Sequence, residues 1–441
     1  MRSLLSLTVF AIGIFSLVPN SFAENWPQWR GPRRDGTATA TGVPVEWTKD
    51  GKNLLWRTPL PGQAGATPCA WGDRIFLTSN EGDDLVVVGL SMRDGRILWK
   101  SKVGGGNQDA RAGEGNSASP SPSTDGRHVW TFFGIGVLSC HTIDGEEVWK
   151  TDVGERFGRI DIQFGMTSTP VLDDGALYLQ LIHGRMKLDD QTRTGKVVKL
   201  DAVTGRTIWE VDRITDAQYE CKQSYASPAI YRDGTREFLV VHGADCITGH
   251  DLADGREVWR FGKLNGPSGT NPKPHDLTFR FVASPGVVPG LIVVPTAKEG
   301  PTVGLKVSDS LSGDCSDKPE VVAWVHPQTP DVSTPLIADG RVYLLHSDGK
   351  LQCLDAVTGE ELWFERTHTG QHRTSPLLVD GRLWFGANNG WVSIVAAGDT
   401  FELINSIEIG EPVTASLIVA DGVLYVRSYD ALYAIGVAGG N

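Results

Sequence analysis

Short runs of β-branched and aromatic residues alternate with turns rich in glycine and aspartate along almost the whole chain. The runs RIFLTS, ALYLQL, RVYLLH and RLWFGA each follow a Gly-Asp or Asp-Gly pair, as at Gly72-Asp73 and Asp174-Gly175. Such pairs supply the positive φ of tight turns, so the pattern predicts antiparallel hairpins. No long stretch shows a convincing helical period. The chain is therefore expected to be all-β.

One phrase, in which tryptophan follows glycine by four positions, closes five of the predicted units. Each unit opens on a small residue, then Ser or Thr, then proline, as in Ala66-Thr67-Pro68, and continues through a hairpin and a third strand. Four antiparallel strands repeated in this way predict the blades of a β-propeller. The phrases run from Gly95 to Trp99, Gly145 to Trp149, Gly205 to Trp209, Gly255 to Trp259 and Gly359 to Trp363.

The number of openings predicts eight blades. Seven openings carry a proline, including one at Ser119-Pro120, and Thr414-Ala415-Ser416-Leu417 supplies an eighth without it. The last unit has only three strands, but the segment around Trp56 resembles the strands that close other blades. An N-terminal strand that completes the C-terminal blade would close the ring and remove its free edges. Residues 53–441 are thus predicted to form one eight-bladed β-propeller; a sandwich would not repeat the tryptophan phrase.

The first 23 residues have the form of a signal peptide. Met1-Arg2 precedes an apolar run, and Ser21-Phe22-Ala23 places small residues before a cleavage site that would leave Glu24 as the new terminus. A retained membrane anchor is the alternative, although the run is short for a span. We expect a periplasmic or secreted monomer with no stable membrane span after cleavage. Residues 24–52 would then form an N-terminal strap.

Charge and cysteine content narrow the possibilities further. The net charge of −12 argues against an extended nucleic-acid surface, which would be basic. Among the six cysteines, Cys140 and Cys353 occupy equivalent places in two repeats and are expected to pack as small apolar residues. Cys221 and Cys246 flank one hairpin, and a disulfide between them remains open.

The phrases KLDAVTGRTIW and CLDAVTGEELW resemble the repeats of quinoprotein-type propellers, named after pyrroloquinoline quinone (PQQ). The resemblance covers roughly residues 53–435. It implies that each tryptophan is a wedge against the glycine peptide of the neighbouring blade. The opening NWPQWRGPRRDG resembles the start of exported PQQ-repeat proteins of uncharacterised function from planctomycete-type bacteria, which implies no activity.

The resemblance points to two functional branches. One comprises PQQ-dependent alcohol and sugar dehydrogenases, in which quinone and commonly calcium lie over the channel beside a catalytic aspartate. Several of those enzymes have a disulfide between adjacent cysteines, which this chain lacks. The other branch comprises propellers without quinone, such as the scaffold lipoprotein of the outer-membrane β-barrel assembly machinery. This chain has no lipid-attachment cysteine near the predicted cleavage site.

A binding site is expected where the long connections between blades meet at the mouth of the channel. Several of these connections carry arginine, which would suit a small anionic ligand or an acidic partner protein. Solvated loop charges are the alternative. The candidate funnel residues are Arg111, Asn116, Arg159, Glu220, Lys222, Asp276, Arg280 and Arg373.

Three further motifs are not expected to form sites. His368 and His372 have a metal-like spacing, but they lie between strands with Gly370 inside the stretch. His275-Asp276 has no recognisable nucleophile beside it. The glycine-rich segment 104–116 lacks the Lys-Ser ending of a phosphate loop.

Two hypotheses follow for function. The preferred one is a non-catalytic binding or scaffold propeller with no cofactor, no metal and no catalytic residue. The alternative is a PQQ-dependent dehydrogenase, which would need oxygen ligands converging on calcium and an aromatic platform beneath the quinone. By sequence, the best-placed acids are Asp161, Glu220 and Asp276, and the candidate platforms are Trp391 and Tyr225.

Overall fold

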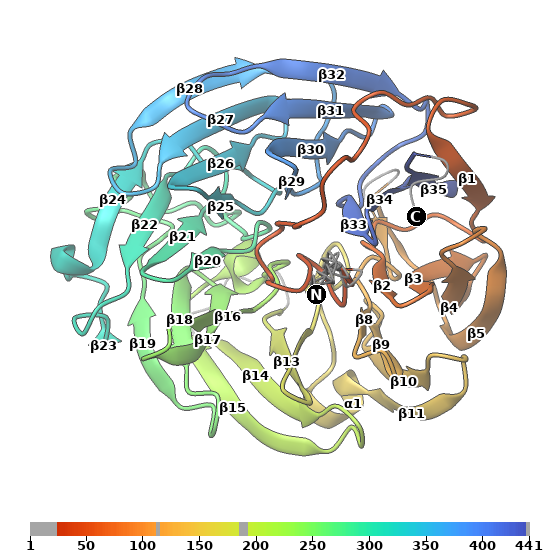
Figure 1. Ribbon diagram of the computed structural model, residues 1–441. Helices are drawn as coiled ribbons and strands as arrows, with labels where there is room; N and C mark the ends of the chain where they lie inside the picture. The colour runs from red at the N-terminus through yellow and green to blue at the C-terminus, as the bar shows by residue number, and fades with distance from the viewer. Residues whose placement is uncertain (1–23, 112–114, 185–192, 438–441) are drawn as a thin grey trace, which may run out of the picture.

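The chain forms a ring of eight antiparallel sheets around a central channel (Figure 1). The computed structural model describes residues 24–111, 115–184 and 193–437, so the predicted signal peptide lies outside them. Each sheet is one blade, in which the strands lie side by side in order from the channel to the rim. The predicted eight-bladed, all-β propeller is confirmed. Helical segments are limited, in the described part, to α1 (Val153–Phe157) and the 3-10 turns Tyr219–Lys222 and Pro319–Val321.

Blades 1 to 4 follow one another in the first part of the chain. A small hairpin of β6 (Asp109–Arg111) and β7 (Gly115–Asn116) lies between blades 1 and 2. The strands, from channel to rim, are β2 (Cys69–Trp71), β3 (Arg74–Glu81), β4 (Asp84–Ser91) and β5 (Ile97–Gly105); β8 (Ser123–Thr124), β9 (His128–Phe132), β10 (Val137–Thr142) and β11 (Glu147–Asp152); β12 (Val171–Asp173), β13 (Ala176–Leu181), β14 (Arg193–Asp201) and β15 (Thr207–Thr215); and β16 (Ala229–Arg232), β17 (Glu237–Gly243), β18 (Cys246–His250) and β19 (Glu257–Phe261).

Blades 5 to 8 complete the ring. An insertion in blade 5 contributes β23 (Gly313–Asp314), which pairs in parallel with β19 of blade 4. The strands, again from channel to rim, are β20 (Gly286–Val288), β21 (Leu291–Pro295), β22 (Thr302–Lys306) and β24 (Val322–His326); β25 (Leu336–Ala338), β26 (Arg341–Leu345), β27 (Lys350–Asp355) and β28 (Glu361–Arg366); β29 (Leu377–Val379), β30 (Arg382–Gly386), β31 (Trp391–Ala396) and β32 (Leu403–Glu408); and β33 (Ile418–Ala420), β34 (Val423–Arg427), β35 (Ala431–Ile435) and β1 (Leu54–Pro59).

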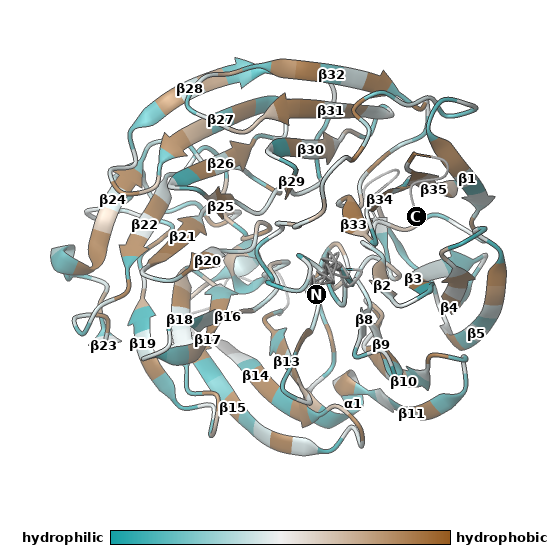
Figure 2. Cartoon of the chain, viewed as in Figure 1, coloured by the Kyte–Doolittle hydropathy of each residue, from teal (hydrophilic) through white to brown (hydrophobic). Residues whose placement is uncertain are grey.

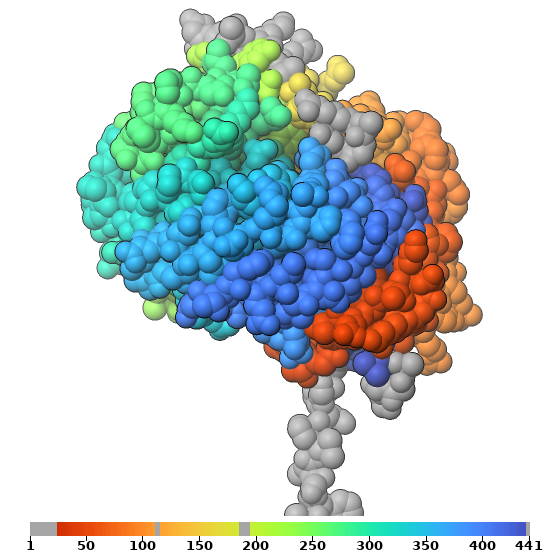
Figure 3. Space-filling model, turned by 90° about the horizontal axis from the view of Figure 1, so that it is seen from above, coloured from red at the N-terminus to blue at the C-terminus, as the bar shows by residue number. Residues whose placement is uncertain are grey.

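The N-terminal strand β1 closes blade 8, as the sequence predicted. It pairs antiparallel with β35, placing Trp56 opposite Ala434. Figure 3 shows this strand, in red, beside the blue C-terminal blade. The pairing covers the outer edge of the last three-stranded unit, so the two ends of the described chain hold the ring closed.

The hairpins form where alternating patterns and turn residues predicted them. Figure 2 shows hydrophobic colouring along the strands and hydrophilic colouring on many of the connecting loops. The middle strands are the most deeply buried, as in β13, where all six residues are buried. Packing of these strands between neighbouring blades forms separate hydrophobic clusters around the ring.

Five rim tryptophans each contact a turn glycine in the next blade. A Cβ atom on Gly95 would lie 2.4 Å from the Trp56 ring, and the Trp56 indole N–H donates to Met92 O at 2.9 Å. The glycine therefore leaves room for a large ring whose N–H finds a carbonyl. The other pairs are Trp99 with Gly145, Trp149 with Gly205, Trp209 with Gly255, and Trp324 with Gly359.

Trp324 was missed by the sequence analysis because the segment that leads to it, PEVVAW, lacks the preceding glycine. Trp363 follows the same geometry with a different partner: its indole N–H donates to Gly398 O at 3.0 Å. Each of these tryptophans faces a residue of the neighbouring strand, and the strand register shifts directly beside that pair in a β-bulge, as next to Cys353↔Trp363. The bulge increases the local twist where the ring turns toward the next blade.

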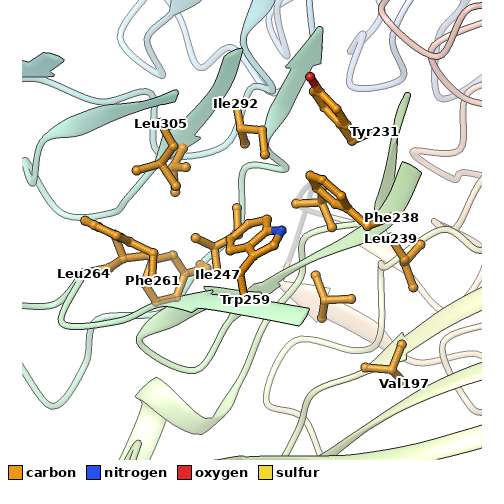
Figure 4. Packing of buried hydrophobic residues seen from close by; sticks show 14 of the residues in the cluster. Val197, Tyr231, Phe238, Leu239, Ile247, Trp259, Phe261, Leu264, Ile292 and Leu305 are labelled. Atoms are coloured by element: carbon orange, nitrogen blue, oxygen red, sulfur yellow. The ribbon is translucent and has the colours of Figure 1, made fainter. Parts of the chain in front are cut away.

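Two seams of the ring are built differently. Between blades 4 and 5, Trp259 packs edge-on against Phe238 and lies near Ile292 and Leu305 (Figure 4). Its indole nitrogen has no hydrogen-bond partner among the described residues, and backbone pairing of β19 with β23 joins the two blades instead. Between blades 7 and 8, Asn405 occupies the tryptophan position and donates to Val45 O of the strap at 2.8 Å.

All six cysteines are buried free thiols. Cys140 and Cys353 lie opposite Trp149 and Trp363 within their blades, as expected for small core residues. The disulfide considered between Cys221 and Cys246 does not form. Cys246 Sγ lies 3.0 Å from Nη2 of the buried Arg213, whereas Cys221 Sγ faces the carbonyl oxygens of the loop after β19.

Candidate functional site

A closed ring of hydrogen bonds surrounds the channel. Each blade contributes one Ser or Thr just before its inner strand, and the backbone N–H of each donates to the side-chain oxygen of the next. Most of these residues precede proline, which has no backbone N–H. The ring bonds therefore join neighbouring blades at a point where the next residue cannot donate a backbone hydrogen bond. The bonds run from Thr67 to Ser121 (3.0 Å), Ser121 to Thr169 (3.0 Å), Thr169 to Ser227 (2.8 Å), Ser227 to Ser284 (2.8 Å), Ser284 to Thr334 (3.3 Å), Thr334 to Ser375 (3.0 Å), Ser375 to Ser416 (2.9 Å) and Ser416 to Thr67 (3.1 Å).

The hydroxyl ring corrects the position at which blade 2 was predicted to open. In the stretch Ser119-Pro120-Ser121-Pro122, the predicted opening of blade 2 was Ser119-Pro120. The structure places Ser121 in the ring, whereas the Ser119 hydroxyl accepts from Asn116 N. Two identical dipeptides in succession gave the sequence no means of choosing between them.

The strap, residues 24–52, crosses one end of the channel (Figure 1). The backbone of Trp26 pairs with that of Ala70 in blade 1 as an isolated β-bridge. The Gln28 side chain forms hydrogen bonds with both the backbone N–H and the carbonyl oxygen of Leu172 in blade 3. Trp29 lines the channel at the hydroxyl ring. Arg30 then reaches blade 7, where Nη1 donates to Pro376 O at 2.7 Å.

Arg30 is almost fully buried, although no carboxylate of the described residues forms an ion pair with it. Its Nη2 donates to Asp35 O at 2.7 Å, so backbone carbonyls satisfy the guanidinium. Burial lowers the pKa of Arg30 to about 10, which still leaves the group charged near neutral pH. The sequence gave no signal for this role, because it depends on where the strap crosses the ring.

A hollow lies at the end of the channel opposite the strap, and we call it the funnel. It encloses about 400 Å³. In each blade, the residue two positions before the Ser or Thr of the hydroxyl ring lines the funnel. Arg280, Asp331 and Gln371, from the connections between blades, add to this lining. The eight residues of the first set are Gly65, Ser119, Thr167, Tyr225, Val282, Val332, Arg373 and Thr414.

Two of the predicted funnel residues, Arg280 and Arg373, do line the funnel. The Arg280 guanidinium pairs with the Glu220 carboxylate and lies over the Phe164 ring, 5.0 Å from its centroid. Stacking and ion pairing hold the planar guanidinium in one orientation. Phe164 and Asp331 were not singled out by sequence, because nothing in their local pattern distinguishes them from other loop residues.

Other predicted funnel residues have different surroundings. Asn116 is buried, and its Nδ2 donates to Gln63 O at 2.6 Å. Asp276 caps its own turn, accepting from the N–H and hydroxyl of Thr278. Lys222 is buried, and Arg159 is exposed. Arg111 ends β6 opposite Gly115.

Two of the acids proposed for a calcium site, Glu220 and Asp276, have other partners. Glu220 is paired with Arg280, and Asp276 accepts from its own turn. Calcium prefers six to eight oxygen ligands around one point. Among the described residues, the one group of three or more candidate metal ligands is Cys221, Asp245 and His275, and it includes only a single carboxylate. The three proposed acids are therefore not gathered into such a group among the described residues.

The two candidate platforms also have other roles. Trp391 stacks on His368, with ring centroids 4.1 Å apart. Tyr225 lines the funnel, but its hydroxyl donates to Gln223 Oε1 at 3.0 Å and its ring tilts against Phe164.

The three motifs that were not expected to form sites contact neighbouring parts of the fold. His372 is buried against Phe385, and burial lowers its pKa to about 4. His275 contacts Asp245 rather than acting with Asp276, at 3.2 Å from Nε2 to Oδ2. Of the glycine-rich segment 104–116, the described parts end β5 and form the β6–β7 hairpin.

An eight-bladed ring of four-stranded blades with these repeats defines a PQQ-repeat propeller. The family described as "Outer membrane protein assembly factor BamB" matches residues 36–188, 117–272 and 243–441. The chain belongs to this family.

Individual relatives fall on both functional branches. The chain is 22% identical to the outer membrane protein assembly factor BamB of Yersinia pestis, over 91% of this chain and 93% of that protein. It is 24% identical to a polyvinylalcohol dehydrogenase of Sphingopyxis sp. (strain 113P3), over 72% of this chain but 46% of the enzyme.

Solved structures share the fold. BamB from Moraxella catarrhalis aligns with a TM-score of 0.60 at 16% identity, over 88% of this chain and 98% of that one. A europium-containing methanol dehydrogenase aligns with a TM-score of 0.67 at 11% identity, over 92% of this chain and 90% of that one. No helix in the described ranges is long and apolar enough to cross a membrane.

Proposed function

We propose that this protein is a non-catalytic binding propeller whose funnel holds an acidic segment of a partner protein. The observation that carries the proposal is the placement of Arg280 and Arg373, from two different blade connections, on one hollow. Arginine offers a planar set of donors that matches carboxylates. No cofactor is required for this function.

The surroundings of the two arginines support binding of an extended segment. Phe164 and Tyr225 give the funnel an apolar wall, while Ser and Thr residues give it a polar floor. Trp29 of the strap lines the floor from the other side. An acidic peptide could therefore enter from the funnel side, with its carboxylates toward the arginines and its apolar atoms against the aromatic wall.

A protein partner is favoured over a small anion by the family. Its relatives of similar length include an outer membrane protein assembly factor. In this proposal the chain acts after export, in the periplasm or outside the cell, once the predicted signal peptide 1–23 has been removed.

The competing function is that of a PQQ-dependent dehydrogenase, since polyvinylalcohol dehydrogenases are also relatives. Less support exists for it, because Glu220 pairs with Arg280, Asp276 accepts from Thr278, and Asp161, Glu220 and Asp276 do not form a group of candidate metal ligands among the described residues.

Binding of labelled peptides to the protein beginning at Glu24 tests the proposal. We expect an acidic peptide to bind and a basic peptide of equal length not to bind, by fluorescence anisotropy. Arg373→Gln should weaken binding about 10-fold or more, since hydrogen bonds to charged groups contribute about 1.5–3 kcal/mol. Arg96→Gln, at an exposed turn on the rim, is the control. Equal affinity of R373Q and wild type for the acidic peptide would contradict the proposal.

A further inference from the structure

Three potential metal ligands meet beside the funnel, and each comes from a different segment. Cys221 lies in the 3-10 turn Tyr219–Lys222, Asp245 in the turn between β17 and β18, and His275 in the connection from blade 4 to blade 5. One ligand atom from each lies within 4.8 Å of the other two. Cys221 and Asp245 are buried, whereas the His275 side chain is 41% exposed.

Hydrogen bonding within the described chain does not satisfy this cluster. Asp245 is 8% exposed, yet its buried Oδ1 has no hydrogen-bond partner among the described residues. A buried carboxylate oxygen without a partner is costly and calls for a bound group. The other oxygen, Oδ2, faces Nε2 of His275 at 3.2 Å.

His275 Nε2 also faces a second polar group. Nδ2 of Asn265 lies 3.0 Å from it. The orientation of the Asn265 amide is fixed, because Nδ2 donates to Asp276 O and Oδ1 accepts from Asp276 N. Asn265, Asp245 and His275 thus place their polar atoms around one point beside the Cys221 thiol.

A cation among the three ligand atoms would give the buried Asp245 carboxylate the partner that it lacks. We propose that Cys221 Sγ, Asp245 Oδ and His275 Nε2 form a binding site for Zn²⁺, with the fourth position open to water. Zinc accepts this mixture of sulfur, nitrogen and oxygen, at about 2.3 Å from sulfur and about 2.0–2.2 Å from the others. The three ligands must close by a short distance, and the exposed His275 side chain can move.

The thiol is the group whose chemistry changes on binding. Burial raises the pKa of Cys221 to about 12, so it is protonated in the metal-free protein. On binding, the S–H bond breaks, the Sγ–Zn bond forms and the proton passes to solvent. Asn265, which lies 3.3 Å from Cys221 Sγ, can then donate to the thiolate.

The site would hold together the loops that shape the funnel. Glu220, adjacent to Cys221, pairs with Arg280 on the funnel wall. A bound metal would therefore fix the segment that orients this arginine. The inference does not depend on the acidic peptide, because metal binding is measured separately from peptide binding.

Cobalt substitution tests the site directly. Metal-stripped protein beginning at Glu24 is titrated with Co²⁺ and then with Zn²⁺. We expect one Co²⁺ per chain, with a thiolate-to-cobalt charge-transfer band that Zn²⁺ removes. Cys221→Ser should abolish the band, and His275→Gln, an exposed change that preserves the core, should weaken Co²⁺ binding at least about 10-fold.

Cys315→Ser is the matched control, because Cys315 is also buried but lies outside the cluster. It should retain both the stoichiometry and the band. Absence of stoichiometric Co²⁺ or Zn²⁺ binding by wild type would overturn the proposal. A band of equal intensity in C221S would overturn it as well.

Discussion

The backbone N–H of Ser416 donates to Oγ1 of Thr67 at 3.1 Å, across 349 positions of sequence. This bond joins the last blade to the first, and it completes the series of inter-blade bonds around the channel. With the pairing of β1 and β35, it closes the propeller at the centre as well as at the rim. The ring thus has two independent closures, one near the channel and one near the outer edge.

Removing the Thr67 hydroxyl should destabilise the ring. Thr67→Val preserves the shape of the side chain but leaves the Ser416 N–H without its acceptor. A buried group that loses its partner costs about 1–3 kcal/mol, so the free energy of unfolding in urea should fall by this amount. Thr67→Ser retains the acceptor and should stay closer to wild type. Equal stability of the two variants would show that the bond contributes nothing.

The contact between Trp56 and Gly95 gives a second prediction. Gly95 has φ of +72°, and an added Cβ would lie 2.4 Å from the Trp56 ring. Gly72 has a similar φ of +61° but nothing within 4 Å of an added Cβ. Gly95→Ala should therefore lower the free energy of unfolding by about 1–3 kcal/mol more than Gly72→Ala, because only the former displaces a packed ring.

The Gly72 variant controls for the backbone conformation, which both substitutions strain. Thermal or urea unfolding measures the difference. If the two alanine variants are equally stable, the Trp56 contact does not help to close the ring.

The fold was predictable because each blade repeats local signals. The Asp-Gly turns, the alternating strands and the strand around Trp56 predicted eight blades and their closure. Where a signal was duplicated or absent, the sequence analysis failed: it chose Ser119 instead of Ser121 and missed Trp324. The seam between blades 4 and 5 depends on β23, a two-residue strand that has no sequence pattern of its own.

The candidate site was less predictable. Arg280 and Arg373 could be anticipated, because long connections lead to the channel mouth. Which partners a side chain finds, however, depends on the conformation of loops that are distant in sequence. Position in sequence therefore could not show that Arg280 lines the funnel while Asn116 and Asp276 bond elsewhere. The convergence of Cys221, Asp245 and His275 also arises only in three dimensions.

Arg30 should hold the strap across the channel. Arg30→Met keeps an extended side chain but removes the donors to Pro376 O and Asp35 O. We expect faster hydrogen exchange at the amides of Ala38 and Leu378, which bond the strap to blade 7. Loss of hydrogen bonds from a charged donor should cost about 1.5–3 kcal/mol locally.

Arg33→Met provides the comparison within the same strap, since the Arg33 side chain is 40% exposed and its ion pairs contribute little. Unchanged exchange at both amides in R30M would contradict a role for Arg30 in anchoring the strap.

Buried histidine should make the protein less stable in acid. Burial lowers the pKa of His242 to about 3 in the folded protein, compared with about 6.5 when unfolded. As pH falls from about 6.5 toward about 3, the unfolded chain takes up a proton that the folded chain does not. The free energy of unfolding should therefore decrease, with a contribution from His242 of up to about 1.4 kcal/mol per pH unit.

His242→Gln removes this titration while keeping a polar group near Pro295 O, which His242 Nε2 contacts at 2.9 Å. Urea unfolding at several pH values between neutral and mildly acidic conditions should give a shallower dependence for H242Q than for wild type. Parallel curves would indicate that His242 does not contribute to acid sensitivity.

The central claim is that the funnel binds without performing redox chemistry. The most direct measurement is the quinone retained by purified protein, beginning at Glu24, after incubation with PQQ and calcium and then desalting. Absorbance and dye reduction with a panel of alcohols and sugars give the two readouts. We predict neither stoichiometric retention nor substrate-dependent dye reduction. One PQQ per chain, with dye reduction on addition of an alcohol or sugar, would contradict the account.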